Sequence, residues 1–210
     1  MLLLAFDTAT PAITVALHDG QRVLAETSTV DARRHGELLA PSIAKVLAGT
    51  EPRELTGIAV GVGPGPFTGL RVGVVTARVF GRTLGIPVHG VCTLDALARA
   101  AVDAQATGQD FLAVTDARRK ELYWARYSAA GERLDGPAVS RPDDLPAGLP
   151  IAGQAVSLYP ALGESIWPEH PSAAVLATLA AEGRGQLPPE PLYLRRPDAQ
   201  IPGQPKRVTS

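Results

Sequence analysis

Two aspartates stand at corresponding places in the chain, each directly after a short apolar run. Asp7 follows Leu2–Phe6 and Asp116 follows Phe111–Thr115. A carboxylate at the end of a buried strand can orient a metal-bound phosphate, and the Thr8 hydroxyl is placed to assist Asp7. The alternative is an Asx turn that only closes the strand end. The repetition of the pattern adds weight to a nucleotide or phosphate site, and both alternatives stay open.

A glycine-rich segment, Gly61–Gly73, joins an apolar strand to a helix. The free N–H groups and the dipole of the helix start can hold an anion there. The segment is no Walker A loop, since no Gly-Lys-Ser/Thr follows, and it lacks the glycine spacing and the acidic residue of a dinucleotide site. The alternative is structural, because Gly69, Gly73 and Gly81 lie on one helical stripe that another element can approach closely. The structural interpretation is favoured.

The other reactive side chains form no recognisable catalytic set. The four histidines lie on different elements without metal-ligand spacing, and no serine has the context of a nucleophile elbow. The single cysteine, Cys92, predicts a small buried residue and a cytoplasmic location. The net charge of −1 argues against a free-standing nucleic-acid binder, and no apolar run is long enough to span a membrane. We therefore predict no metal and no catalytic residue.

Apolar periodicity predicts the elements that position these residues. The first part of the chain has the order of three strands, then helix, strand, helix, strand and helix. Leu2–Phe6 predicts a strand covered on both faces, and Ile13–Leu17 alternates like a second strand. The Asp19-Gly20 pair then predicts a hairpin turn. The chain is therefore expected to open with an antiparallel meander.

Three helices are predicted in this first part. One covers His35–Ala48, with Pro41 in its first turn or at a kink. A longer one covers Leu70–Leu84, with Thr68 as its N-cap. A third is capped by Thr93 and runs to about residue 104. These helices would carry the apolar surface of the first half.

The pattern of strands then restarts in a shorter second half. The strand before Asp116 is followed by a hairpin strand at Leu122–Tyr127, a turn at Gly153 and a small helix over Ser172–Glu182. We predict a first half over residues 1–105, a smaller second half over 106–196, and an unstructured polar tail over 197–210. This weak internal echo indicates two related halves.

Several segments together resemble the bacterial TsaB (YeaZ) family, over about residues 1 to 196. The resemblance implies an α/β fold of the actin/Hsp70/sugar-kinase (ASKHA) type, with two ribonuclease-H-like halves, mixed sheets and a reduced second half. The segments that carry it are Leu4–Thr10, Arg34-His35, Gly63–Gly73, Gly90–Leu94, Asp116–Tyr123 and Pro191–Arg195.

The resemblance implies that the chain is an accessory subunit in tRNA modification rather than an enzyme. A TsaB-like chain is expected to be the non-catalytic partner of TsaD, with the TsaE ATPase joining, for threonylcarbamoylation of the adenosine next to the anticodon. TsaD-like subunits bind a metal through two helical histidines, and the corresponding stretch, Leu94–Gln105, has none. The chain is expected to contact tRNA only through the complex. No membrane partner is expected. In the absence of TsaD, the chain can form a homodimer.

An alternative is a nucleotide-binding enzyme of the same fold, an ATPase or kinase that uses Asp7 and Asp116. The adenosine-binding glycine pair of the superfamily is reduced here to Gly153 followed by Gln154. No cofactor is therefore expected, and ATP or ADP remains the alternative. A peptidase, an activity attached to this superfamily, would need a nucleophile, base and metal set that the sequence does not supply.

The family also implies a partner interface, because its first two helices form a four-helix bundle with the partner. The apolar and glycine residues of these helices are expected to divide between that interface and this chain's own sheet. The candidate interface residues are Leu38, Leu39, Ile43, Val46, Gly69, Val72, Gly73, Val75 and Val79.

Overall fold

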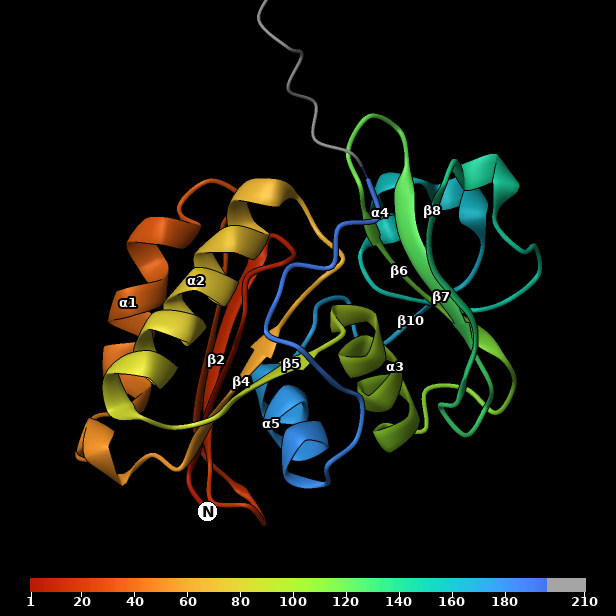
Figure 1. Ribbon diagram of the computed structural model, residues 1–210. Helices are drawn as coiled ribbons and strands as arrows, with labels where there is room; N and C mark the ends of the chain where they lie inside the picture. The colour runs from red at the N-terminus through yellow and green to blue at the C-terminus, as the bar shows by residue number, and fades with distance from the viewer. Residues whose placement is uncertain (196–210) are drawn as a thin grey trace, which may run out of the picture.

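The computed structural model describes residues 1–195, which form two β-sheets with helices on and between them (Figure 1). The predicted tail, 197–210, lies outside the described residues. The first sheet has the order β11-β5-β4-β1-β2-β3. Its strands are β1 (Leu3–Asp7), β2 (Ala12–His18), β3 (Val23–Val30), β4 (Gly57–Gly61), β5 (Val88–Val91) and β11 (Gln186–Leu187).

The second sheet repeats the topology of the first. Its order is β10-β9-β6-β7-β8. As β1 pairs antiparallel with β2 and parallel with β4, so β6 pairs antiparallel with β7 and parallel with β9. This repeat confirms the predicted ribonuclease-H-like halves of an actin/sugar-kinase-like fold. The strands are β6 (Phe111–Asp116), β7 (Leu122–Tyr127), β8 (Arg133–Ser140), β9 (Ile151–Ala152) and β10 (Ser165–Ile166).

The helices differ in size between the halves. In the first half two long helices precede β4 and β5, whereas short helical turns take their places in the second half. The α-helices are α1 (His35–Val46), α2 (Phe67–Leu84), α3 (Thr93–Asp103), α4 (Ala155–Leu158) and α5 (Ala173–Ala181). The 3-10 turns are η1 (Pro52–Glu54), η2 (Pro142–Asp144) and η3 (Pro160–Leu162).

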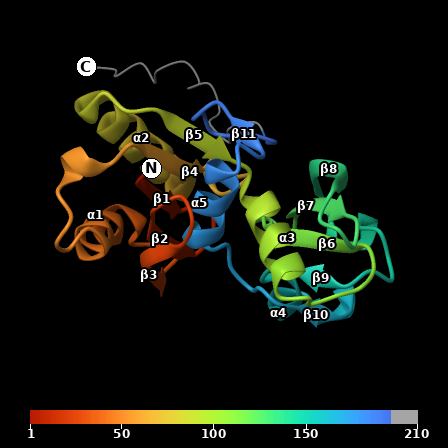
Figure 2. The ribbon, with the colours of Figure 1, turned by 90° about the horizontal axis from the view of Figure 1, so that it is seen from below.

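Alternation along the strands builds a hydrophobic core on each face of the first sheet. Leu4 and Phe6 of β1 are fully buried on the face that α1 and α2 cover. Leu3 and Ala5 point to the opposite face, where α5 packs. The facing side chains there are mostly alanines, so α5 approaches the sheet closely. Figures 1 and 2 show α1 and α2 on one side of this sheet and α5 on the other.

The last helix of each half covers the sheet of the other half. α3 follows β5 of the first sheet, yet its Leu94 and Leu97 pack with Phe111 of the second sheet. α5 follows β10 of the second sheet, yet it packs on the first. Figure 2 shows α3 and α5 between the two sheets. The predicted assignment of residues 106–196 to one half is therefore corrected, because α5 and β11 complete the first sheet.

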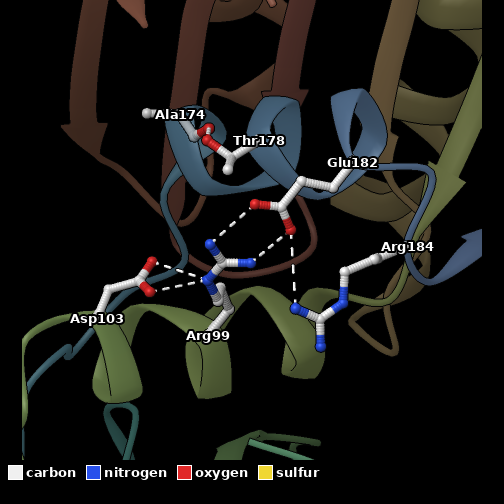
Figure 3. A network of polar contacts seen from close by, with 6 residues as sticks. All are labelled: Arg99, Asp103, Ala174, Thr178, Glu182 and Arg184. Atoms are coloured by element: carbon white, nitrogen blue, oxygen red, sulfur yellow. Dashed lines mark hydrogen bonds and ion pairs between the residues drawn. The ribbon is translucent and has the colours of Figure 1, made fainter. Parts of the chain in front are cut away.

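A polar network fastens the two exchanged helices together (Figure 3). Arg99 of α3 donates through Nη1 to a Glu182 carboxylate oxygen at 2.7 Å, and through Nε to Asp103 at 2.8 Å. Arg184 lies 3.7 Å from the same Glu182 carboxylate. Partly exposed pairs of this kind contribute less than about 1 kcal/mol each, so the network orients the helices more than it stabilises them.

Two predicted helix starts need correction. α2 begins at Phe67 with Pro66 as its N-cap, so Thr68 lies inside the first turn. α3 has Cys92 as its N-cap, so Thr93 is the first helical residue. Of the two predicted places for Pro41, the first turn is wrong, because Pro41 lies in the middle of α1. Within residues 1–195, no helix combines the length and apolarity that crossing a bilayer requires.

Candidate functional site

The two aspartate-bearing turns meet at a small hollow between the halves, of about 250 Å³. The β1–β2 turn contributes Thr8 and the β6–β7 turn contributes Asp116, while Gln154 comes from the start of α4. The first turns of α1 and α2 complete the lining with Gly36 and Thr68. The structure therefore brings Thr8 and Asp116 to one hollow.

Asp7 lies directly beneath this hollow but does not line it. Its side chain is fully buried, and one carboxylate oxygen accepts the Ala9 N–H at 2.6 Å, which is an Asx turn. The other oxygen accepts the Thr93 hydroxyl at 2.6 Å. Burial raises the pKa of the Asp7 carboxyl, although the bonds from Thr93 and Ala9 and the nearby His35 act in the opposite direction. Asp7 is thus engaged inside the protein.

Thr93 links Asp7 to the glycine-rich segment. Its hydroxyl accepts the Gly63 N–H at 3.2 Å while it donates to Asp7. Its own N–H donates to the Gly63 carbonyl at 2.8 Å. Gly61 makes room for this arrangement, since a Cβ there would overlap the Asp7 carboxylate. The unit joins β1, the glycine-rich segment and α3.

The glycines after β4 allow close packing within this chain. A Cβ on Gly65 would collide with the Ala9 carbonyl, and one on Gly69 would lie 2.5 Å from the Thr8 carbonyl oxygen. The Thr8 hydroxyl in turn donates to the Gly69 carbonyl at 2.8 Å. Gly73 also faces Thr8. These contacts support the structural interpretation of the segment, and they place the glycine stripe against the β1–β2 turn of its own chain.

The second turn presents Asp116 beside a strained stretch of backbone. Asp116 accepts the Arg118 N–H at 2.8 Å, and the Arg118 guanidinium lies 3.4 Å from the same carboxylate. Arg118, Arg119 and Lys120 all adopt left-handed conformations, with φ of 63°, 55° and 60°. Three consecutive non-glycine residues in this region are costly, and such outliers concentrate at functional positions.

Gly153 does not open onto the hollow. It has a φ of 109°, and a Cβ there would overlap the Val114 carbonyl. Its N–H donates to the Pro168 carbonyl at 2.7 Å. The predicted nucleotide-site residues are therefore split: Thr8 and Asp116 line the hollow, whereas Asp7 and Gly153 serve the local packing.

The hollow suits an anion better than a metal-bound nucleotide. The starts of α1 and α2 and the cations Arg33 and Arg118 border it. A magnesium ion would need free carboxylates, but Asp7 is fully buried and Asp116 forms an ion pair with Arg118. Within residues 1–195, no group of three or more His, Cys, Asp or Glu side chains could hold a metal ion.

The predicted interface residues also divide into two groups. Five are buried in this chain and unavailable to a partner in this structure, which corrects their placement: Leu39, Ile43, Val46, Gly69 and Gly73. Leu38 and Val72 are half-buried against the same core. Val75 and Val79 of α2 are 57% and 56% exposed. They border an open hollow of about 630 Å³ together with Arg78 and Arg82.

A C-terminal strap, residues 186–195, makes contacts that sequence reasoning missed. Tyr193 stacks on Phe67 at the start of α2, with ring centroids 4.5 Å apart, and its hydroxyl accepts a bond from Arg71 at 2.7 Å. Arg195 then pairs with Glu121 of the second half at 2.8 Å. The only sequence signal for the strap is the Pro191–Arg195 segment, which local periodicity does not single out. Figure 1 shows this segment passing between the two halves.

Comparison with known proteins gives one family and several relatives. The protein-family model for TsaD, tRNA N6-adenosine threonylcarbamoyltransferase, matches residues 22–160 of this chain. An uncharacterized protein of Mycobacterium leprae is 47% identical over 95% of this chain and 56% of its own length. TsaB of Escherichia coli, a tRNA threonylcarbamoyladenosine biosynthesis protein, is 36% identical over 60% of this chain and 55% of its own length. This chain therefore spans little more than half the length of these two relatives.

Solved structures also match over nearly the whole chain. YeaZ from Pseudomonas aeruginosa superposes with a TM-score of 0.77 at 30% identity, and the match covers 92% of this chain and 99% of that one. A match over 92% of this chain includes residues of both halves.

Proposed function

Because this chain belongs to the TsaB (YeaZ) family, we propose that it is a non-catalytic subunit of the machinery that forms threonylcarbamoyladenosine in tRNA. It pairs with the catalytic subunit TsaD, and the TsaE ATPase joins the assembly. The tRNA, modified at the adenosine next to the anticodon, is contacted only through the complex. The complex works in the cytoplasm.

Three features of the chain support a non-catalytic role. The stretch 94–105 lacks the paired histidines expected of a TsaD-like metal site. Asp7 is buried and fully engaged, so it does not reach the hollow between the halves. The glycine-rich segment packs closely against its own β1–β2 turn.

The exposed face of α2 is the observation that carries the pairing proposal. Val75 and Val79 are one helical turn apart and more than half exposed, which is unusual for two neighbouring valines on a soluble helix. Arg78 and Arg82 flank them and supply polar contacts at the rim of an interface. We define Val75, Arg78, Val79 and Arg82 as the α2 face.

Size-exclusion chromatography of a mixture with purified TsaD tests the pairing. A Val75→Asp/Val79→Asp variant places charges in the centre of the α2 face and should weaken the complex by about 100-fold or more. The matched control is Val23→Asp/Leu24→Asp, since both residues are exposed on the edge strand β3. The control should bind TsaD like the unchanged protein. Equal binding by both double variants would refute the α2 face as the docking surface.

A reconstituted modification assay separates the pairing from a catalytic contribution. With TsaD, TsaE, ATP and tRNA, the α2-face variant should lose threonylcarbamoyladenosine formation, and Asp7→Asn should retain it. Loss of activity in Asp7→Asn with an intact complex would contradict the non-catalytic role.

Alone, the chain pairs with itself through the same face, so sedimentation should show a dimer that the α2-face variant loses.

The ATP or ADP alternative stays a prediction that calorimetry can test directly. A chain that binds no nucleotide by itself gives no heat with Mg-ATP. Tight binding that disappears in Asp116→Ala would instead support an ATPase or kinase that uses the hollow between the halves.

A further inference from the structure

The second sheet has a thinly covered outer face. In the first half, α1 and α2 cover the corresponding face over 12 and 18 residues. In the second half the equivalent connections hold only η2, of three residues, and α4, of four, followed by the short turn η3. Trp124 and Leu112 on this face are therefore covered by loops rather than by a long helix.

This thin cover leaves a concave hollow of about 790 Å³. Its floor and walls are largely aliphatic, with Leu145, Ile151 and Leu162 continuous with the core beneath. Leu158 lies on its rim and is 53% exposed. A hollow of this size and lining lies within the range of small-molecule sites, about 300–1,000 Å³.

Cationic side chains gather at one part of the lining. Arg119 and Lys120 come from the left-handed turn between β6 and β7, and Arg141 comes from the end of β8. The lining holds one acidic residue, Asp143. Within residues 1–195, Lys120 and Arg141 form no ion pair. The strained turn thus holds positive charge beside an apolar wall.

We propose that this hollow binds a small organic anion, a molecule with an apolar ring or chain and one phosphate, sulfonate or carboxylate group. The apolar part lies against Leu145, Ile151 and Leu158, and the anionic group meets Lys120 and Arg141. The positively charged residues at the rim complement the charge of the anionic group. The aliphatic lining favours a ligand with an apolar part over a fully polar one. A net charge of −1 for the whole chain disfavours RNA as the occupant. The proposal does not depend on the pairing with TsaD.

Two fluorescent probes of the same shape test both halves of the proposal. 8-Anilinonaphthalene-1-sulfonate carries an anionic group, and N-phenyl-1-naphthylamine has the same ring system without it. The full chain should bind both, and the sulfonate more tightly. A Lys120→Gln/Arg141→Gln variant should weaken the sulfonate probe about tenfold and leave the neutral probe unchanged. The matched control, Lys45→Gln/Arg53→Gln, removes the same charges from the first half and should change neither.

A third variant tests the apolar wall. Leu158→Asn should weaken both probes, and its far-ultraviolet circular dichroism should match that of the unchanged protein because the side chain is largely exposed. The proposal is overturned if neither probe binds the folded chain, or if the double-glutamine variant binds the sulfonate as tightly as the control does. Displacement of the sulfonate probe by a single-stranded RNA oligonucleotide, at lower concentration than by a simple aryl phosphate, would also overturn it.

Discussion

Replacing Thr93 with valine should destabilise the protein through two buried polar groups. Valine has nearly the shape of threonine, so it leaves no cavity, but it removes the hydroxyl. The Asp7 carboxylate then loses its 2.6 Å bond, and the Gly63 N–H loses its 3.2 Å acceptor. A buried polar group left without its hydrogen-bond partner costs about 1–3 kcal/mol, so for the two groups we expect a loss of about 2–6 kcal/mol in the free energy of unfolding.

Urea denaturation followed by circular dichroism measures this loss. With an m value of about 3 kcal/mol/M, the midpoint should fall by about 0.7–2 M, with the slope unchanged. Thr93→Ser keeps the hydroxyl and serves as the control, and it should stay within about 1 kcal/mol of the unchanged protein. If valine and serine at position 93 have the same small effect, the Asp7–Thr93–Gly63 unit does not hold the first half together as argued.

Four further predictions concern single residues. Burial raises the pKa of Asp7, so the folded protein binds the proton of this carboxyl more tightly than the unfolded chain does. The free energy of unfolding should therefore fall as the pH rises from the unfolded pKa of 3.8 to the folded pKa, by at most about 1.4 kcal/mol per pH unit. Urea titrations at several pH values measure this dependence, and Asp7→Asn should lack it. Gly69→Ala should lower the free energy of unfolding by about 2 kcal/mol or more in thermal unfolding, because the added Cβ meets the Thr8 backbone. Gly36→Ala is the control, since a Cβ there has nothing within 4 Å, and it should be neutral or raise the free energy of unfolding by up to about 1 kcal/mol. The reverse order would contradict the packing described. Burial and the nearby Asp95 raise the pKa of Cys92 to about 12, so the native thiol should not react with a disulfide reagent at pH 8 until urea is added. Lys120→Gly should raise the melting temperature relative to Lys120→Ala, because glycine adopts a φ of 60° without the cost of about 1 kcal/mol that alanine retains.

Local patterns predicted the strands better than the helix starts. The apolar run at Leu2–Phe6 and the Asp19-Gly20 turn correspond to β1 and to the β2–β3 hairpin. The sequence predicts Thr93 as the cap of α3, but its hydroxyl donates a hydrogen bond to Asp7, 86 positions away in sequence. A cap is a local contact, whereas this bond exists only once the sheet has formed. Thr68 similarly gives way to Pro66 as the N-cap, so α2 begins at Phe67, three residues before the predicted Leu70.

The site could be predicted only in part, because periodicity marks an apolar helix face without naming its neighbour. The repeated strand-aspartate pattern indicated two related halves, whereas only the structure shows that Thr8 and Asp116 line one hollow. The sequence indicates that Gly69 and Gly73 allow close packing, but only the folded structure identifies the β1–β2 turn as the element they contact. The exchange of α3 and α5 between the sheets is a long-range pairing with no local signature.

That exchange sets the order in which the protein can be completed on the ribosome. The strands β1 to β5 of the first sheet are complete at Val91, but α5, which covers one face of this sheet, ends at Ala181, ninety residues later. At elongation rates of about 5–20 residues per second, that face waits about 5–18 s for its cover. A nascent chain released before residue 173 keeps Leu3 and Val91 open to solvent, so a truncated product displays the surface by which chaperones and proteases distinguish it from the finished protein.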